Sequence, residues 1–145
     1  MNETATQKRL AMAGALLFLV GMVTGVFAAA ALTGKVKVGN AHLALASHLN
    51  GLLGGLWLIA VAWTFRFLHY GARGLRRLTL AIAIPAWANW LVTLIASFLG
   101  VTGLEYTGQR SNDIVAFLLQ TCVVLPTLIA CGFWAWGFRG GAGGK

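Results

Sequence analysis

Three side chains in this sequence are able to do chemistry and also lie within long apolar stretches. His48 and Asn50 lie in the second such stretch, and Asn89 lies near the middle of the third. A polar side chain at membrane depth raises the free energy unless it finds a partner, so each of the three marks a candidate functional site. A neutral imidazole can bind a metal, and an amide can orient a polar ligand.

The residues around His48 form a face of small side chains. Spacings of i, i+4, i+7 and i+11 put four residues on one side of a helix: Ala44, His48, Gly51 and Gly55. The glycines taken alone favour close packing against another helix. An imidazole above a groove of small residues instead suits a flat cofactor or a metal. We therefore predict that His48 is a metal ligand, with the three small residues as cofactor contacts.

Asn89 stands between Trp87 and Trp90, which lie too far from the ends of their stretch to form an interfacial belt. The asparagine either joins two helices by a hydrogen bond or orients a polar substituent in an aromatic pocket. Thr93 continues this stretch toward the external side, and Gln120 enters the fourth stretch from that side. We expect these polar groups at overlapping depths, in the external half of the membrane.

The elements that must position these residues are four long apolar stretches. Hydrophobic residues make up 59% of the 145 residues and charged residues only 10%, whereas about a quarter of a soluble domain is charged. A helix needs about 20 apolar residues to cross the hydrocarbon core. The stretches that reach this length are residues 10–32, 43–65, 78–99 and 114–138. We predict a single all-α integral membrane domain over residues 1–145, folded as a bundle of four transmembrane helices.

The formal net charge of +8 is unevenly distributed along the chain. Four crossings place both termini and the second connection on one side, with eight of the eleven basic residues. The positive-inside rule then puts both termini in the cytoplasm of a multi-pass protein, in a bacterial-type inner membrane. This charge predicts topology and contact with anionic lipid headgroups, and it does not favour nucleic acid as a partner.

Absent features narrow the class of protein. No apolar stretch contains Asp or Glu, which disfavours a proton-coupled transporter. The short motifs of hydrolases, zinc proteases and nucleotide-binding proteins are also missing. Cys122 and Cys131 lie on opposite sides of one helix, so they do not pair within it. Three classes remain open: a membrane enzyme, a non-catalytic haem protein passing electrons, and a small transporter or structural subunit.

Several short motifs follow one another in a familiar order. Residues 47–51 (Ser-His-Leu-Asn-Gly) and 58–63 (Leu-Ile-Ala-Val-Ala-Trp) resemble the second helix of the hydroxylaminobenzene mutase and styrene oxide isomerase superfamily. Residues 87–90 (Trp-Ala-Asn-Trp), a long fourth helix and its ending at 137–140 (Gly-Phe-Arg-Gly) agree with the same family. The resemblance covers residues 9–140. It implies a four-helix membrane enzyme that isomerises aromatic compounds without net redox change.

The resemblance also implies roles for particular residues. In the styrene oxide isomerase branch, the histidine that matches His48 is an axial ligand of haem b, held between the protomers of a trimer. We therefore expect ferric haem b as cofactor, His48 as its ligand and a homotrimer as the assembly. Asn89 matches a third-helix motif residue, and we expect it to act in catalysis with Asn50. The substrate pocket expected around them comprises Trp87, Trp90, Thr93 and Gln120.

Three departures from the family pattern refine the expected activity. The epoxide-isomerising branch has a tyrosine in place of Thr93 and an acid in place of Pro85, which favours the mutase branch here. Both branches often carry an asparagine in place of Gly54, so Asn50 is the candidate replacement amide, although it faces another direction. The expected reaction is conversion of hydroxylaminobenzene, or a substituted arylhydroxylamine, to the 2-aminophenol, with haem iron as Lewis acid. The alternatives are an aromatic epoxide isomerase and a non-catalytic haem protein for electron transfer.

Overall fold

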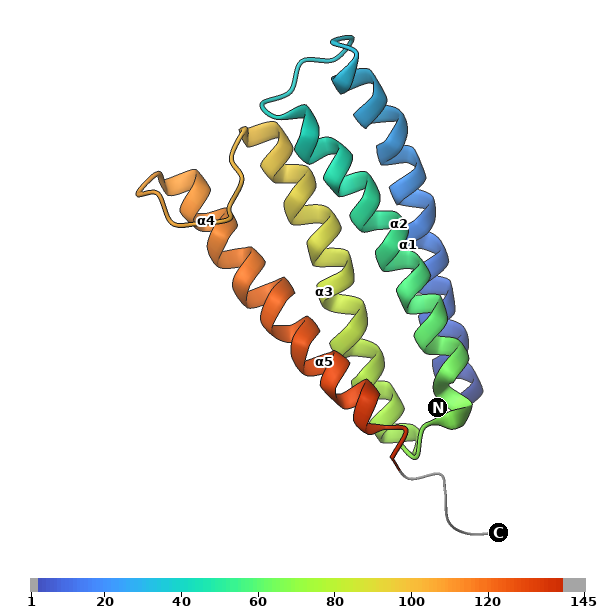
Figure 1. The fold of residues 1–145 in the computed structure, drawn as a ribbon. Coiled ribbons are helices and arrows are strands. Elements are labelled where there is room, and N and C mark those ends of the chain that lie inside the picture. Colours follow the sequence, from blue (N-terminus) through green and yellow to red (C-terminus); the bar gives the residue numbers. More distant parts are fainter. Residues whose placement is uncertain (1–2, 140–145) are drawn as a thin grey trace, which may run out of the picture.

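The computed structural model describes residues 3–139, which form four long helical spans joined by short connections (Figure 1). The prediction of an all-α chain with four spans is confirmed, because each span is long and apolar enough to cross a membrane. The elements in chain order are α1 (Glu3–Leu32), α2 (Ala41–Thr64), the short 3₁₀ turn η1 (Phe65–Phe67), α3 (Ala72–Leu99), α4 (Arg110–Leu118), the π-helical turn η2 (Leu119–Val124) and α5 (Leu125–Trp136).

The helices begin earlier than the apolar stretches that predict them. The first stretch begins at residue 10 and α1 at Glu3, while the third begins at residue 78 and α3 at Ala72. Polar residues that flank an apolar stretch continue its helix into the headgroup layer, since nothing in those flanks breaks a helix. The apolar stretch therefore locates the part inside the hydrocarbon, and the helix itself is longer.

The four spans are not packed equally. The most extensive contact joins α1 to α2, while α3 packs on both and the fourth span packs mainly on α3. Figure 1 shows α1 and α2 on one side of α3, with α4 and α5 on the other. The fourth span is fastened to α2 at one end, where the Trp134 Nε1–H donates to Thr64 Oγ1 at 2.9 Å. A crevice therefore runs across α3, between α2 and the fourth span.

The fourth span changes its winding halfway along. Pro126 has no N–H, so it cannot make the usual helical bond to the carbonyl four residues earlier. Immediately before it, the Leu125 N–H donates to the Gln120 carbonyl, five residues back. This π-helical turn shifts the register of the helix, and such turns often occur at functional sites. Gln120 within this turn and Thr127 after it therefore do not share a face as they would in a regular helix.

The beginning of α1, the α2–α3 connection and the end of α5 lie at one end of the molecule (Figure 1). We call this the basic end. Most basic residues in the described part of the chain are found there: Lys8, Arg9, Arg66, Arg73, Arg76, Arg77 and Arg139. The opposite end carries Lys35, Lys37 and Arg110. Cytoplasmic placement of the basic end remains a prediction from this charge difference.

Candidate functional site

His48 faces α1, where its ring is held in a defined orientation. Its Nδ1 lies 2.8 Å from the carbonyl oxygen of Gly21. A carbonyl only accepts hydrogen bonds, so Nδ1 must donate, and the neutral ring keeps its lone pair on Nε2. Proteins commonly fix a metal-binding imidazole in this way, with one ring nitrogen on a carbonyl and the other free for the metal.

The second ring nitrogen of His48 is accessible. Nε2 makes no hydrogen bond within residues 3–139, and no enclosed side-chain nitrogen or oxygen in this part of the chain lacks a partner. It follows that Nε2 is not completely enclosed by the protein. The ring itself is half-buried.

Gly25 on α1 makes room for the imidazole. A Cβ atom at this position would lie 2.7 Å from both Cε1 and Nδ1 of His48, so a larger residue would displace the ring. Gly21 supplies the carbonyl one turn earlier. Neither glycine appears among the predicted site residues. Their i, i+4 spacing in the first apolar stretch is the signal that could have found them.

The small residues of α2 lie in the same helix contact. A Cβ on Gly51 would stand 2.6 Å from the Gly21 Cα, and one on Gly55 would stand 2.7 Å from the Gly14 carbonyl oxygen. Ala44 is fully buried beside alanines of α1. The groove that the sequence predicts along this face is therefore filled by α1. Close helix packing accounts for Ala44, Gly51 and Gly55, and we do not carry them into a cofactor site.

Asn50 faces the other way, toward α3. Its Nδ2 donates to Asn89 Oδ1 at 3.3 Å and to Thr93 Oγ1 at 3.1 Å. Two residues correspond to a turn of about 200° around an α-helix, which puts Asn50 on the face opposite His48. The structure thus brings together three of the predicted residues. The Asn50 Oδ1 and the Asn89 Nδ2 make no hydrogen bond within residues 3–139, which leaves one acceptor and one donor for a ligand.

A cavity of about 290 Å³ lies beside these asparagines, in the crevice between α2, α3 and the fourth span. Gly54 and Pro85, two positions at which the sequence departs from the family pattern, lie on its wall. The cavity has an aromatic wall at Trp57 and a hydroxyl at Thr127, neither of which the sequence analysis singled out. Trp57 follows Asn50 by seven residues, about two turns, and that spacing could have found it. Thr127 was obscured by the π-helical turn that precedes it.

The other predicted pocket residues lie elsewhere. The Trp90 Nε1–H donates to Thr24 Oγ1 of α1 at 3.0 Å. Trp87 meets Trp90 edge-on, with 6.1 Å between ring centroids, and neither ring lines the cavity. Gln120 is exposed and accepts a hydrogen bond from the Tyr106 hydroxyl at 3.3 Å. The aromatic wall expected from the tryptophan pair is supplied in this cavity by Trp57.

The donor groups of the chain restrict the kind of metal centre it could hold. Within residues 3–139, no three His, Cys, Asp or Glu side chains come together. His42 is exposed where α2 begins, and the Nδ1 of His69 lies 2.8 Å from the Gly137 carbonyl at the basic end. A centre built only from side chains is therefore not available there. A haem brings its own nitrogen ligands and needs one axial ligand, which fits the accessible Nε2 of His48.

Comparison with known proteins gives two matches. The family model described as styrene oxide isomerase matches residues 6–139. Hydroxylaminobenzene mutase HabB from Ectopseudomonas oleovorans is 32% identical over 147 residues, which cover 95% of this chain and 84% of that protein. No solved structure matches the chain. Both names describe isomerases, and both similarities extend over nearly the whole chain.

Proposed function

The chain belongs to the styrene oxide isomerase family, and we propose that it is a membrane isomerase that rearranges hydroxylaminobenzene, or a ring-substituted relative, to the 2-aminophenol. The observation that carries the proposal is the pair of asparagines on a cavity wall. Asn50 and Asn89 present one free acceptor and one free donor to a space of about 290 Å³. An apolar cavity of about 150 Å³ is enough for benzene, so one substituted ring fits.

The proposed reaction moves a hydroxyl group within the substrate. The N–O bond breaks and a C–O bond forms at the ortho carbon, while the proton lost from that carbon balances the proton gained at nitrogen. The product is an isomer of the substrate, and no external oxidant or reductant is needed. The protein must bind the ring, hold the hydroxylamino group and keep bulk water away from the departing oxygen.

The residues of the cavity are suited to those tasks. The free amide N–H of Asn89 can donate to the oxygen that departs, and the carbonyl of Asn50 can accept from the substrate N–H. Trp57 offers a ring face for stacking against the aromatic substrate. A ring held in this way presents a fixed ortho carbon, which favours the ortho product over a mixture of ring positions.

Haem b is the cofactor that we propose, and the Nε2 of His48 would hold its iron. The Gly21 carbonyl fixes the tautomer and Gly25 accommodates the ring, which supports this role for His48. A ferric haem bound there would supply a Lewis-acidic iron toward the substrate's nitrogen or oxygen.

Two copies of the chain are required to bring the proposed parts together. His48 contacts α1, and the asparagine cavity lies on the opposite side of α2. We propose that the seam between α1 and α2 of one protomer meets the cavity of the next. An interface between two different faces closes into a ring when its rotation allows, and a homotrimer is such a ring.

The first test is conversion of hydroxylaminobenzene by membranes that contain the protein, with no added nucleotide or reductant. We expect 2-aminophenol as product, and a fall of about 100-fold in kcat for Asn89→Ala, because a donor to the departing oxygen is lost. Gln120→Ala is the matched control, since its side chain is exposed and lies away from the cavity. It should retain wild-type turnover.

Two results would oppose this function. Conversion of styrene oxide without conversion of the hydroxylamine would identify the epoxide branch of the family instead. Equal turnover in Asn89→Ala and wild type would remove the asparagine pair from the mechanism, whichever substrate is used.

A further inference from the structure

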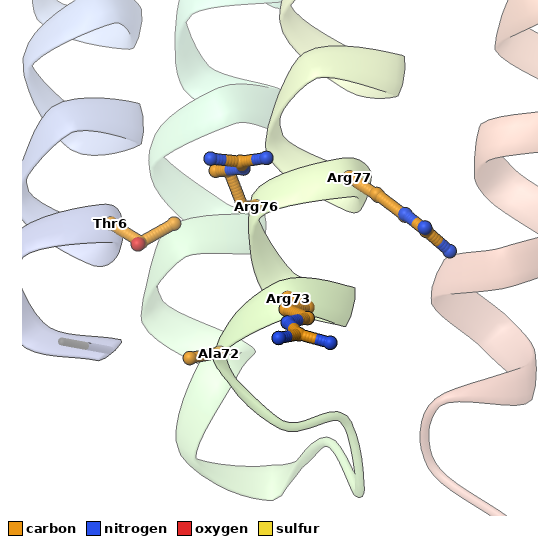
Figure 2. A pocket seen from close by; sticks show the side chains of 5 residues that line it. All are labelled: Thr6, Ala72, Arg73, Arg76 and Arg77. Carbon is orange, nitrogen blue, oxygen red and sulfur yellow. The ribbon is translucent and has the colours of Figure 1, made fainter. Parts of the chain in front are cut away.

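Three arginines at the beginning of α3 surround a hollow of about 210 Å³ at the basic end. Arg73, Arg76 and Arg77 share this hollow with Thr6 of α1 (Figure 2). All three arginines are exposed, and within residues 3–139 none forms an ion pair or stacks on an aromatic ring. The three side chains leave the first turns of α3 in different directions (Figure 2), and their like charges repel one another unless an anion binds nearby.

Other arginines at the same end are engaged differently. The Arg66 guanidinium lies 4.9 Å from the Trp63 ring centroid and 4.6 Å from that of Phe67. Arg139 lies over Trp136 at 4.5 Å. These contacts are typical of cations that hold an interfacial aromatic residue. The α3 arginines therefore form a separate group, and they make no ion pair with the described acidic residues, including Glu3 at the same end.

An apolar groove adjoins the arginines. It has a volume of about 370 Å³ and lies between α3 and α5, with Leu78, Ala81 and Phe133 on its walls. Arg77 lines both the groove and the hollow, and Figure 2 shows its side chain extended toward the fourth span. The arginine hollow therefore adjoins an apolar groove that can hold a hydrocarbon chain.

The arginine hollow and the apolar groove lie at the depths of a phospholipid's headgroup and its acyl chain, respectively. The apolar stretch of α3 begins at Leu78, so Arg76 and Arg77 stand at headgroup level, immediately outside the hydrocarbon. The groove is lined by Tyr70, Gly74 and Arg77 at this level, and it continues inward to Leu78 and Ala81. The first turn of α3 adds amide groups with no side-chain cap, and the partial positive charge of a helix N-terminus favours a phosphate.

We propose that the α3 arginines and the α3–α5 groove together bind one anionic phospholipid, with its phosphate among the guanidinium groups and an acyl chain in the groove. Guanidinium is suited to phosphate because it can donate two parallel hydrogen bonds. The inference is independent of the reaction that the protein catalyses.

The test is lipid binding by the full-length protein in detergent, followed by native mass spectrometry. The probes are phosphatidylglycerol, phosphatidylcholine with the same acyl chains, and glycerol phosphate, which has no chain. We expect wild type to prefer phosphatidylglycerol, and the double variant Arg76→Gln with Arg77→Gln to bind it about 30-fold more weakly. The control is Arg66→Gln with Arg139→Gln, which removes the same charge from the stacked arginines. It should bind like wild type.

A third variant tests the groove. Ala81→Trp should weaken phosphatidylglycerol binding and leave binding of glycerol phosphate unchanged, because the substitution fills only the apolar part. If both double variants lost phosphatidylglycerol binding equally, the effect would be one of general charge, and the proposal would be overturned. Equal affinity for the two phospholipids, or binding of glycerol phosphate as tight as that of the lipid, would also overturn it.

Discussion

At the scale of the residue, the orientation of His48 has a direct spectroscopic consequence. With Nδ1 on the Gly21 carbonyl, only Nε2 is available to an iron, so His48→Ala should abolish axial ligation. We expect purified wild-type protein, expressed with ample haem, to show a Soret band that the variant loses or shifts. His42→Ala is the control, since His42 is exposed on the same helix. A wild-type protein without the band would contradict the cofactor proposal.

Thr127 is the second residue whose role can be measured. Several hydroxyls in the spans donate to a carbonyl of their own helix, as Thr121 does to Phe117 at 2.7 Å. The Thr127 hydroxyl makes no hydrogen bond within residues 3–139 and lines the cavity. Thr127→Val should therefore raise KM by about 5- to 10-fold through loss of one substrate hydrogen bond. Thr121→Val should leave KM unchanged, and similar KM values in both variants would remove Thr127 from substrate binding.

At the scale of the element, the α1–α2 contact depends on glycines. The Cβ of a larger residue at Gly55 would meet backbone atoms of Gly14 and Phe18 at 2.7 Å, and backbone cannot move aside cheaply. We expect Gly55→Val to destabilise the protein by about 1–3 kcal/mol. This should appear as a lower Tm in detergent. Gly132→Val is the matched control, because a Cβ at Gly132 has no neighbour within 4 Å. Equal Tm values for the two variants would argue against a tight contact.

The fourth span shows how one element can change the composition of a site. In a regular helix, Gln120 and Thr127 would lie about two turns apart on nearly the same face. Gln120 lies within the π-helical turn at Leu119–Val124 and Thr127 follows it, and Thr127 lines the cavity while Gln120 meets Tyr106. The expectation that Gln120 belongs to the pocket assumed a regular helix, whereas regular winding ends at Leu118 and resumes at Leu125, next to Pro126.

At the scale of the whole molecule, the proposed active site is divided between protomers. Co-expression of His48→Ala with Asn89→Ala should then restore activity that neither variant has alone. In randomly mixed oligomers, about a quarter of the interfaces would combine an intact His48 with an intact Asn89. The measurement is turnover of hydroxylaminobenzene by the mixed preparation, compared with each variant by itself. Activity that stays at the level of the single variants would place the whole site within one chain.

The sequence by itself determined the four helical spans and which polar residues lie within them, because membrane spanning depends on the length and polarity of local stretches. It also identified His48, Asn50 and Asn89 as unusual. The free energy of placing a polar side chain in hydrocarbon depends on that residue and the apolar stretch around it, and both are visible in the sequence. Only the tertiary structure decided which neighbour each one meets. His48 and Asn50 lie two residues apart, yet one contacts α1 and the other contacts α3.

The reason lies in contacts between residues far apart in the sequence. The face that receives α1 is fixed by glycines on both helices, such as Gly21 and Gly51, and their pairing across the two spans is not visible in either span alone. Once α1 fills that face, the cavity has to form on the other side of α2, where Trp57 and Thr127 join the asparagines. The local sequence pattern therefore predicted the spans and the polar residues in them. Close packing between the spans decided that His48 and Asn50 lie on different faces of α2.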